Sequence, residues 1–372
     1  MTKNRSNYVD KIEVLKEGLK VFFSNKSEDT FPNIWLRDHA KDESNWDERS
    51  NQRKTFTAKL NPNIKIKNAN ISKKGEYIDI IWSDASNNIQ YSSEFLYKNS
   101  VNYSHDKNQI KIWENQEIKD DIFLIYKNLI SDKGFKNLLT TLHTFGFAVI
   151  TDCKRDISSV EFVAKKIGYV RNSIFGGLWS FESNADMADS AYTNEELRPH
   201  TDSTYSNDAP GLQLLLCCEY DAKGGDSIMV DGLKIAETIK AKNKDLYNVL
   251  TKIDVPGNYT GDGVILEAKR PIIKLDDKNQ IAQISFNNYD RAPFRLNPKL
   301  TKIFYEAISL FDNLANSKQY QWRYILKPGD LLIFNNWRVL HGRGSFSGKR
   351  KMKGCYLNKE DFDSSCKING LI

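Results

Sequence analysis

The sequence lacks several features that would point to other classes of protein. Its 372 residues contain only five cysteines, with no CxxC pair and an odd total. This usage favours reduced thiols in a cytoplasmic protein over a disulfide framework. No apolar run reaches the length of a membrane span, and the basic N-terminal segment is not followed by the apolar stretch of a signal peptide. We therefore expect a cytoplasmic protein that does not cross a membrane.

Clustered positive charge is also missing. The formal charge is +6, from 54 Lys and Arg against 48 Asp and Glu, and most basic residues stand near acidic ones. Nucleic-acid binding depends on grouped cations that neutralise phosphates, and no long Lys/Arg run interleaved with aromatics is present. The composition therefore argues against a nucleic-acid partner.

The chain divides into two regions by pattern. Residues 1–105 hold short segments of strand length between polar turns: KIEVL, LKVFF, FTAKL, IKIKN and YIDIIWS. The region 106–372 begins with helical spacing and continues mainly as short strands. Many antiparallel strands with flanking helices favour a double-sheet jelly roll. We predict a small N-terminal β domain over 1–105 and a mainly β domain over 106–372. The helical segments expected in the second domain are 122–145, 158–168, 233–253 and 298–317.

Histidine is scarce, with only five in the chain. His200 and Asp202 stand two apart in RPHTDSTYS, and an extended backbone would place both side chains on one face. His341 follows much later in FNNWRVLHGRG. Two imidazoles and one carboxylate are the ligands of non-haem Fe(II), and they leave coordination positions open for a co-substrate and O2. We predict that these three residues bind iron. A surface histidine beside a turn aspartate is the alternative for an isolated HxD pair.

An arginine strengthens the iron assignment. Arg350 follows His341 after the turn GSFSGK, and a hairpin there would carry both side chains into one cavity. A guanidinium can bind a carboxylate through two parallel hydrogen bonds, which suits the distal carboxylate of 2-oxoglutarate. A solvated cation within GKRKMK is the alternative for this residue alone.

Several distinctive words occur together and in a fixed order. They are WLRDHA (35–40), GFAVI (146–150), AYT (191–193), HTDSTY (200–205), GGDSIMVDG (224–232), NNYDRA (287–292), NNWRVLHGR (335–343) and GCYL (354–357). On these words, nearly the whole chain resembles the γ-butyrobetaine hydroxylase and trimethyllysine dioxygenase family of 2-oxoglutarate oxygenases. The resemblance is closer to the trimethyllysine dioxygenases. It implies an N-terminal β domain, a catalytic double-stranded β-helix and a homodimer.

The resemblance also implies an activity. The expected reaction is Fe(II)- and 2-oxoglutarate-dependent hydroxylation of N6,N6,N6-trimethyllysine to its 3-hydroxy product, a step of carnitine biosynthesis. By resemblance, His200, Asp202 and His341 bind iron, and Arg350 and Ser227 bind 2-oxoglutarate. Two alternatives stay open: γ-butyrobetaine or another quaternary ammonium compound as the substrate, and an inactive jelly roll that only binds a quaternary amine. The complete set of iron ligands with Arg350 argues against the inactive binder. The sequence does not fix the exact substrate, the regiochemistry or the oligomeric state.

A trimethylammonium group has no N–H to donate, so its recognition relies on aromatic faces. The segment before HTD is rich in aromatic side chains. By resemblance, Phe175, Trp179 and Tyr192 stand at positions of an aromatic cage that Tyr356 closes. Ordinary core packing of these rings is the alternative.

Polar residues are expected at the other end of the substrate. Asp189 suits the α-ammonium of trimethyllysine, a group that γ-butyrobetaine lacks. Tyr205 and Asn288 are candidates for the substrate carboxylate. A turn or helix-cap role is the alternative for Asp189.

One segment departs from the family. Relatives often carry a cysteine cluster after WLRDH that binds a structural zinc, whereas residues 39–54 contain no cysteine. A structural zinc site needs about four nitrogen or sulfur ligands. We therefore expect no structural zinc, and a hydrogen-bonding role for His39.

Overall fold

The computed structural model describes residues 7–84, 87–101, 103, 110–182 and 194–372. The chain forms two compact units, Met1–His105 and Asp106–Ile372. All five cysteines are buried and free. No helix among the described residues combines the length and the low polarity that crossing a bilayer requires.

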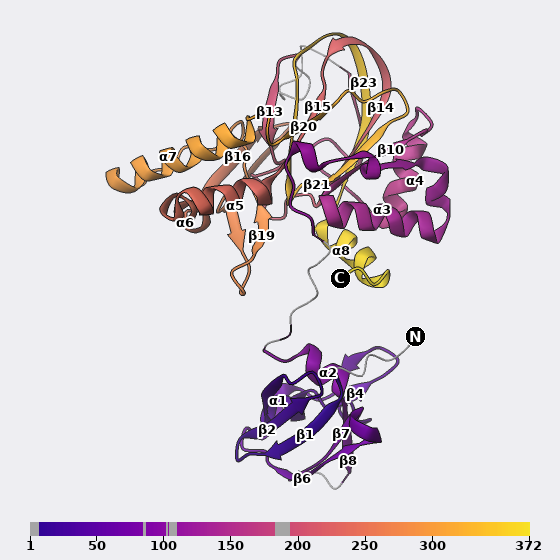
Figure 1. Ribbon diagram of the computed structural model, residues 1–372, viewed down its shortest axis with the longest axis vertical. Coiled ribbons are helices and arrows are strands. Elements are labelled where there is room, and N and C mark those ends of the chain that lie inside the picture. The colour runs from indigo at the N-terminus through magenta and orange to yellow at the C-terminus, as the bar shows by residue number, and fades with distance from the viewer. Residues whose placement is uncertain (1–6, 85–86, 102, 104–109, 183–193) are drawn as a thin grey trace. The chain divides into compact units, whose positions relative to one another are not determined.

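Two three-stranded antiparallel sheets, β1-β2-β3 and β6-β7-β8, form most of the N-terminal unit (Figure 1). Side-chain alternation decides which face of each strand is buried: in β7, Ile78, Ile80 and Trp82 are fully buried, and the residues between them are partly exposed. The elements of this unit are β1 (Val9–Val14), β2 (Gly18–Phe23), β3 (Glu28–Pro32), α1 (Asn33–Asp38), β4 (Trp46–Asp47), β5 (Gln52–Arg53), β6 (Ile66–Ser72), β7 (Tyr77–Trp82), β8 (Asn88–Ser92) and α2 (Ser93–Lys98).

Two sheets also form the centre of the C-terminal unit. The larger has the order β11-β23-β14-β21-β10-β9, with β12 paired to β23, and the smaller has the order β13-β22-β15-β20. This arrangement of curled sheets with helices outside confirms the mainly β, double-stranded β-helix fold. The strands of the larger sheet are β9 (Phe123–Ile125), β10 (Phe147–Thr151), β11 (Val170–Arg171), β12 (Leu178–Glu182), β14 (Leu212–Gly224), β21 (Leu331–Asn335) and β23 (Phe346–Leu357). Those of the smaller sheet are β13 (Leu197–His200), β15 (Ser227–Asp231), β20 (Gln321–Tyr324) and β22 (Val339–Arg343).

Helices cover the outer faces of these sheets. The larger sheet packs against α3 (Asp132–Phe145), α4 (Ile157–Ile167) and α8 (Lys359–Ile368), whose apolar side chains join one buried cluster with alternate residues of β14. The smaller sheet packs in a second cluster with α5 (Gly232–Lys242), α6 (Lys244–Lys252) and α7 (Pro298–Ala315). Two hairpins stand beside them: β16 (Val255–Gly261) with β17 (Val264–Arg270), and β18 (Ile273–Leu275) with β19 (Ile281–Ile284).

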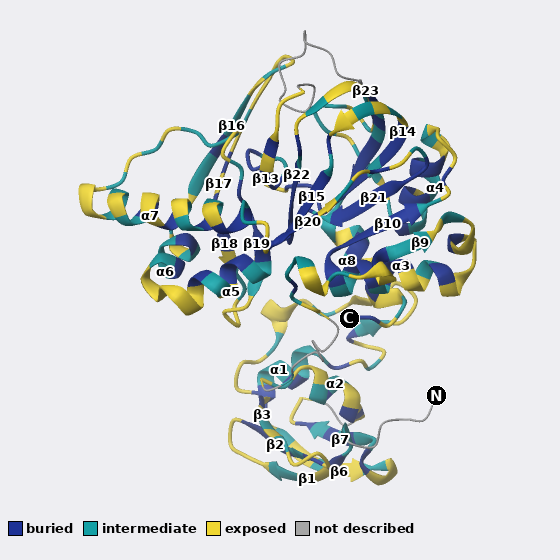
Figure 2. Ribbon diagram, turned by 45° about the horizontal axis from the view of Figure 1, so that its top comes forward, coloured by how far each residue is buried: buried dark blue, intermediate teal, exposed yellow. Residues whose placement is uncertain are grey.

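Many side chains of the candidate site lie on the inner faces of the two sheets. Along β14, Leu212, Leu214 and Leu216 pack against the outer helices, so Gln213 and Leu215 face the opposite way. The strands β15, β21 and β22 are buried along nearly their whole length, as the dark blue in Figure 2 shows. The interior between the sheets is therefore shielded from solvent by the helices on either side.

Several predicted elements were wrong in their extent. The segment FTAKL contains a short 3-10 helix, Thr57–Lys59, because it pairs with no neighbouring strand among the described residues. The helix expected from 122 begins only at Asp132, where the Ser131 side chain accepts a hydrogen bond from Gly134 N–H. The helix expected over 233–253 is two helices, because Asn243 ends α5 and caps the start of α6.

Candidate active site

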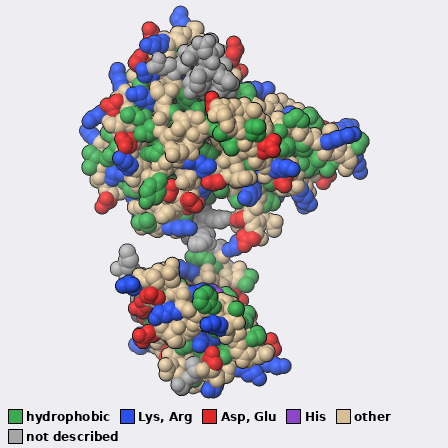
Figure 3. All heavy atoms as spheres, turned by 180° about the vertical axis from the view of Figure 1, so that it is seen from behind, with side chains coloured by type: hydrophobic (Ala, Val, Ile, Leu, Met, Phe, Trp, Pro, Cys, Tyr) green, Lys and Arg blue, Asp and Glu red, His purple; other side chains and the backbone are tan. Residues whose placement is uncertain are grey.

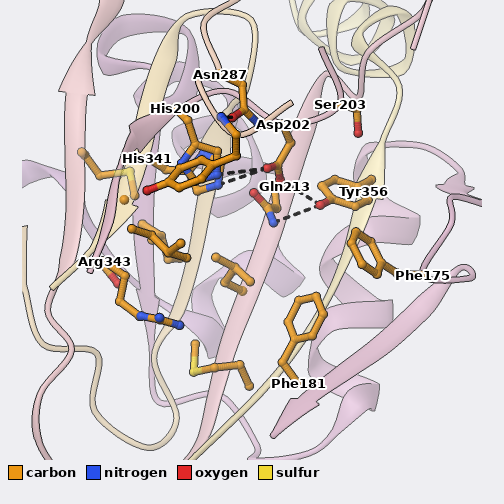
Figure 4. Close-up of a pocket in the computed structure, with 18 of the residues that line it drawn as sticks. Phe175, Phe181, His200, Asp202, Ser203, Gln213, Asn287, His341, Arg343 and Tyr356 are labelled. Carbon is orange, nitrogen blue, oxygen red and sulfur yellow. Dashed lines mark hydrogen bonds and ion pairs between the residues drawn. The ribbon is translucent and has the colours of Figure 1, made fainter. Parts of the chain in front are cut away.

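Two neighbouring strands bring the histidines of the predicted triad together. His200 of β13 and His341 of β22 stand directly opposite each other in the antiparallel register, and their ring centroids are 4.4 Å apart. Asp202 Oδ1 lies 3.4 Å from His200 Nε2 and 3.5 Å from His341 Nε2. One ligand atom from each residue can lie within 4.8 Å of the others. The three side chains converge on one point, as Figure 4 shows.

Strand alternation alone does not explain how Asp202 comes to lie beside the two histidines. β13 ends at His200, and Ser203 adopts a left-handed φ of 56°. Between them, Thr201 N–H donates to Phe286 O at 2.7 Å. The Asp202 N–H donates to Asn336 Oδ1 at 2.8 Å. Side-chain and backbone hydrogen bonds therefore hold Asp202 beside the histidines after the strand has ended.

Two members of the triad, Asp202 and His341, have charge states that suit a cation. At His200, burial lowers the pKa, but the hydrogen bond and the charge of Asp202 outweigh burial, so the pKa of His200 is raised. Burial raises the pKa of Asp202, but His341, His200 and the Tyr356 hydroxyl outweigh it, so the pKa is lowered. The Tyr356 hydroxyl donates to Asp202 Oδ2 at 2.8 Å, and Gln213 Nε2 donates to the Tyr356 oxygen at 3.4 Å. Burial lowers the pKa of His341 to about 3. An ionised carboxylate beside a neutral imidazole is the state that metal coordination requires.

A cavity of about 150 Å³ opens next to the triad. Its wall combines side chains from the inner faces of both sheets with loop residues. Besides the triad, the lining residues include Phe175, Phe181, Ser203, Tyr205, Gln213, Ser227, Asn287, Tyr289, Asp290, Arg343, Arg350 and Tyr356.

Two arginines line one part of this cavity. Arg343 and Arg350 contact the same ring, with their guanidinium carbons 4.9 and 5.0 Å from the centroid of Phe346. Arg350 is 7% exposed, and its Nε is buried without a hydrogen-bond partner among the described residues. Burial lowers the pKa of Arg350, and burial together with the charge of Arg350 lowers the pKa of Arg343 to about 10. Ser227 is paired with Arg343 across the sheet. This part of the cavity is suited to an anion.

The predicted hairpin between His341 and Arg350 was wrong. β22 pairs with β13 and β15, whereas β23 pairs with β11, β12 and β14, so the chain crosses from one sheet to the other after Arg343. His341 and Arg350 nevertheless line the same cavity, because the inner faces of the two sheets both border it.

Aromatic rings line another side of the cavity, which we call the aromatic wall and define as Phe175, Phe181 and Tyr356 (Figure 4). Phe175 and Phe181 meet edge to face with centroids 5.5 Å apart. Trp179 does not line the cavity. It packs behind the aromatic wall, 4.4 Å from Phe181 and 5.6 Å from Tyr356, where Gly354 leaves room for its ring.

The remaining predicted residues divide between three places. Tyr205 lines the cavity, whereas Asn288 borders two other cavities and its neighbour Asn287 takes the inward position. Asp189 and Tyr192 lie outside the described residues. Asp290 lines the cavity and was not predicted, although it belongs to the NNYDRA word.

Sequence reasoning also missed Arg343, Gln213 and Phe181. Arg343 stands two residues after His341 on one strand, so alternation could have placed both on the inner face. No signal in the sequence points to Gln213, because its role depends on the pairing of β14 with β23.

The N-terminal unit contains His39 in a packed position. Its ring stacks on Trp35 with centroids 4.3 Å apart, and its Nδ1 lies 2.7 Å from Trp35 O. The expectation of no structural zinc stays a prediction.

Sequence profiles of known families match much of this chain. The sequence profile of the taurine catabolism dioxygenase TauD, TfdA family matches residues 115–356, and that of the γ-butyrobetaine hydroxylase-like N-terminal region matches residues 11–97. The protein named trimethyllysine dioxygenase, mitochondrial, of Gallus gallus is 31% identical over 360 residues, which cover 92% of this chain and 84% of the relative. The γ-butyrobetaine dioxygenase of Pongo abelii is 28% identical over 357 residues, covering 91% of each chain.

A solved structure is similar in fold. It is a Burkholderia xenovorans protein assigned as an alpha-ketoglutarate-dependent taurine dioxygenase, with a TM-score of 0.50 and 12% identity. The match covers 61% of this chain and 84% of that chain.

Proposed function

The chain belongs to the taurine catabolism dioxygenase TauD, TfdA family, and from that premise we propose that it is an Fe(II)- and 2-oxoglutarate-dependent dioxygenase of N6,N6,N6-trimethyllysine. The observation that carries the proposal is a single cavity that joins the His200, Asp202 and His341 triad, a buried arginine and an aromatic wall. Each part suits a different component of the reaction.

Fe(II) fits the triad. His200 and His341 each turn Nε2 toward Asp202 Oδ1, so two imidazole nitrogens and one carboxylate oxygen face a common point. This ligand set leaves coordination positions open on the metal. When bound there with 2-oxoglutarate and O2, iron supplies the oxidant for C–H hydroxylation, and 2-oxoglutarate leaves as succinate and CO2. The Tyr356 hydroxyl donates to the Asp202 carboxylate, and the Asn336 side chain accepts from the Asp202 backbone N–H, so the two residues hold Asp202 in place.

The arginine part of the cavity fits 2-oxoglutarate. We assign Arg350 to the distal carboxylate, because a buried guanidinium without a hydrogen bond at Nε gains a charge-assisted partner on binding. Gly225 supports the close approach: its φ is 75°, and a Cβ there would stand 3.1 Å from Arg350 Nη1. Ser227 is 6% exposed on the same wall and offers a hydroxyl to the same anion.

The aromatic wall fits a trimethylammonium group. A desolvated aromatic face contributes roughly 1–2 kcal/mol toward such a cation. Phe175, Phe181 and Tyr356 present their rings to the cavity beside the triad. Trp179 acts by supporting Phe181 and Tyr356 from behind. The cage roles of Tyr192 and the polar role of Asp189 stay predictions.

Trimethyllysine is proposed over γ-butyrobetaine on the words HTDSTY and NNYDRA and on the name of the Gallus gallus relative. The γ-butyrobetaine alternative is supported by the name of the Pongo abelii relative, which is nearly as similar. A catalytically inactive binder of quaternary amines would need neither the triad nor Arg350. The 3-hydroxy product and a role in carnitine biosynthesis are part of the proposal.

The decisive experiment measures succinate release from 2-oxoglutarate and Fe(II) with trimethyllysine, γ-butyrobetaine or no added amine. The wild type is expected to respond most to trimethyllysine. Asp202→Ala is expected to abolish the response and also the binding of Mn(II). Asp221→Ala, which removes an exposed acid from β14, is the matched control. Full turnover by Asp202→Ala at saturating iron would refute the triad assignment.

Three further expectations belong to this proposal. A homodimer and a cytoplasmic location follow from the resemblance and the cysteine usage, and they stay predictions, since the Gallus gallus relative is named mitochondrial. The absence of a nucleic-acid partner also stays a prediction. On the face seen in Figure 3, basic and acidic side chains are interspersed, which is consistent with that expectation.

A further inference from the structure

Charged side chains are segregated within the cavity. Arg343 and Arg350 line one part of it, and the carboxylate of Asp290 lines another, beside Asn287. In Figure 4, Arg343 and Asn287 lie on opposite sides of the triad. The proposed co-substrate is a dianion and occupies the arginine part. The acidic part therefore remains for the substrate, whose chemistry it must match.

The Asp290 carboxylate is held in a fixed position. Its Oδ2 accepts hydrogen bonds from Asn287 Nδ2 at 2.8 Å and from Thr204 Oγ1 at 3.4 Å. The Asn287 oxygen in turn accepts from Tyr289 N–H at 2.8 Å and from Asp290 N–H at 3.4 Å. These bonds fix the orientation of both side chains, which are half-buried at the cavity wall. A half-buried carboxylate held in this way offers a preorganised site for a cation.

The two candidate substrates differ at this end. Trimethyllysine carries an α-ammonium as well as a carboxylate, whereas γ-butyrobetaine carries a carboxylate alone. An ammonium donates a charge-assisted hydrogen bond to a nearby aspartate, whereas a lone carboxylate is repelled by the aspartate. The Asn287 amide group is next to Asp290 and can donate to the substrate carboxylate.

We propose that Asp290 is the specificity-determining residue that binds the α-ammonium of an α-amino acid substrate, with Asn287 beside it for the carboxylate. This inference rests on the proposed function, because it presumes that the trimethylammonium group occupies the aromatic wall. Asp189 was expected to take this role and lies outside the described residues, whereas Asp290 is placed at the cavity wall.

The test compares two ligands that differ only in the α-amine: trimethyllysine and its deamino analogue, (trimethylammonio)hexanoate. Dissociation constants are measured by calorimetry on the full chain with Mn(II) and 2-oxoglutarate, so that no turnover occurs. The wild type is expected to prefer trimethyllysine by roughly 10- to 100-fold, the usual effect of one hydrogen bond to a charged group. Asp290→Asn is expected to bring the two constants within about twofold of each other.

Two further variants separate the charge from the loop structure. Thr204→Val removes one hydrogen bond to Asp290 but leaves the carboxylate, so the preference is expected to remain. Asp290→Glu keeps the charge and moves it by one methylene, so an intermediate preference is expected. If Asp290→Asn does not fold, an unchanged preference in Asp290→Glu overturns the inference.

Several results would contradict the role of Asp290. An unchanged preference in Asp290→Asn would do so, as would an equal loss of affinity for both ligands, which indicates a structural role. Loss of the preference in Asp189→Asn alone would give the role to Asp189. In each of these cases trimethyllysine turnover by the wild type still supports the proposed function. Absence of that turnover, by contrast, refutes the proposed function itself.

Discussion

Two buried arginines of the C-terminal unit stand in opposite environments. Arg338 donates to Asp231 through Nε at 3.1 Å and Nη2 at 2.8 Å, and its other hydrogen bonds reach the backbone oxygens of His143, Thr144 and Lys111. Arg350 is equally buried, at 7% against 6% exposure, but its Nε has no hydrogen-bond partner among the described residues. The first arginine is satisfied by the fold, whereas one buried N–H group of the second is not satisfied by any described residue.

This contrast separates residues that stabilise the fold from residues that bind a ligand. A buried polar or charged group costs stability unless it has a partner. A buried group that the fold leaves without a partner therefore indicates a role in binding. Arg338 joins the end of α3, the segment at Lys111 and the cap of α5, and we call this region the arginine anchor. Variants of the arginine anchor should change stability, and variants of the cavity should change binding.

The largest effect is expected in the arginine anchor. Arg338→Met should lower the free energy of unfolding by about 3–5 kcal/mol, because Asp231 would remain buried without its partner. Urea unfolding measures this loss. Arg323→Met is the control, since its ion pair with Asp226 is 40% exposed at the arginine and should contribute less than about 1 kcal/mol. Equal effects of the two variants would contradict the contrast.

Metal binding should stabilise the unit that contains the triad. At a hundred times its dissociation constant, Mn(II) should raise the free energy of unfolding by about 2.7 kcal/mol. Differential scanning calorimetry with and without metal measures the shift. Asp202→Ala should show none. A shift that persists in this variant would place the stabilising metal elsewhere.

Arg350→Met should change binding more than stability. Loss of a charge-assisted contact should raise the 2-oxoglutarate concentration that gives half-maximal turnover. The expected increase is roughly 10- to 100-fold. The metal-free variant should unfold at the same or a higher urea concentration than the wild type, because a buried charge with an unsatisfied N–H group has been removed. A decrease in stability like that of Arg338→Met would show that Arg350 is also part of the folding framework.

The smallest effect is expected at the Asp202 carboxylate. Tyr356→Phe removes the hydroxyl that donates to Asp202 but keeps the ring of the aromatic wall. The affinity for Mn(II) should fall by about 2- to 10-fold, the usual contribution of a single hydrogen bond, because the ionised carboxylate of Asp202 remains in place. The KM for trimethyllysine should change less. A larger change in KM than in metal affinity would mean that the hydroxyl contacts substrate.

Much of the fold could be predicted from local patterns. The apolar alternation of YIDIIW and of β14 is a property of short segments, and so is the capped helix α7. Such features can be predicted from the sequence alone. These patterns predicted the fold class, and the structure confirmed it. The hairpin β16–β17 was missed, because its glycines and charged residues weaken the apolar alternation of VPGNYTG and VILEAKR.

The site was predictable only in part, because its residues come from both sheets. The spacing of His200 and Asp202 indicated a metal. The backbone N–H groups of Thr201 and Asp202 hold this segment by donating to Phe286 and Asn336, which belong to distant parts of the chain. In the NNYDRA loop no strand period applies, so the sequence could not decide which of two adjacent asparagines faces inward. Trp179 and Phe181 share one face of β12, yet only Phe181 reaches the cavity, because Gly354 accommodates the larger ring.

The crossing of the chain from β22 to β23 has a consequence for the order of assembly during synthesis. β23 lies between β11 and β14 in the larger sheet and carries Arg350 and Tyr356, although it follows every other described strand of that sheet in the sequence. The sheet therefore keeps an unpaired edge on β14 until residues 346–357 have been made. Such an edge favours association with other chains, so truncation before β23 should yield aggregation-prone protein.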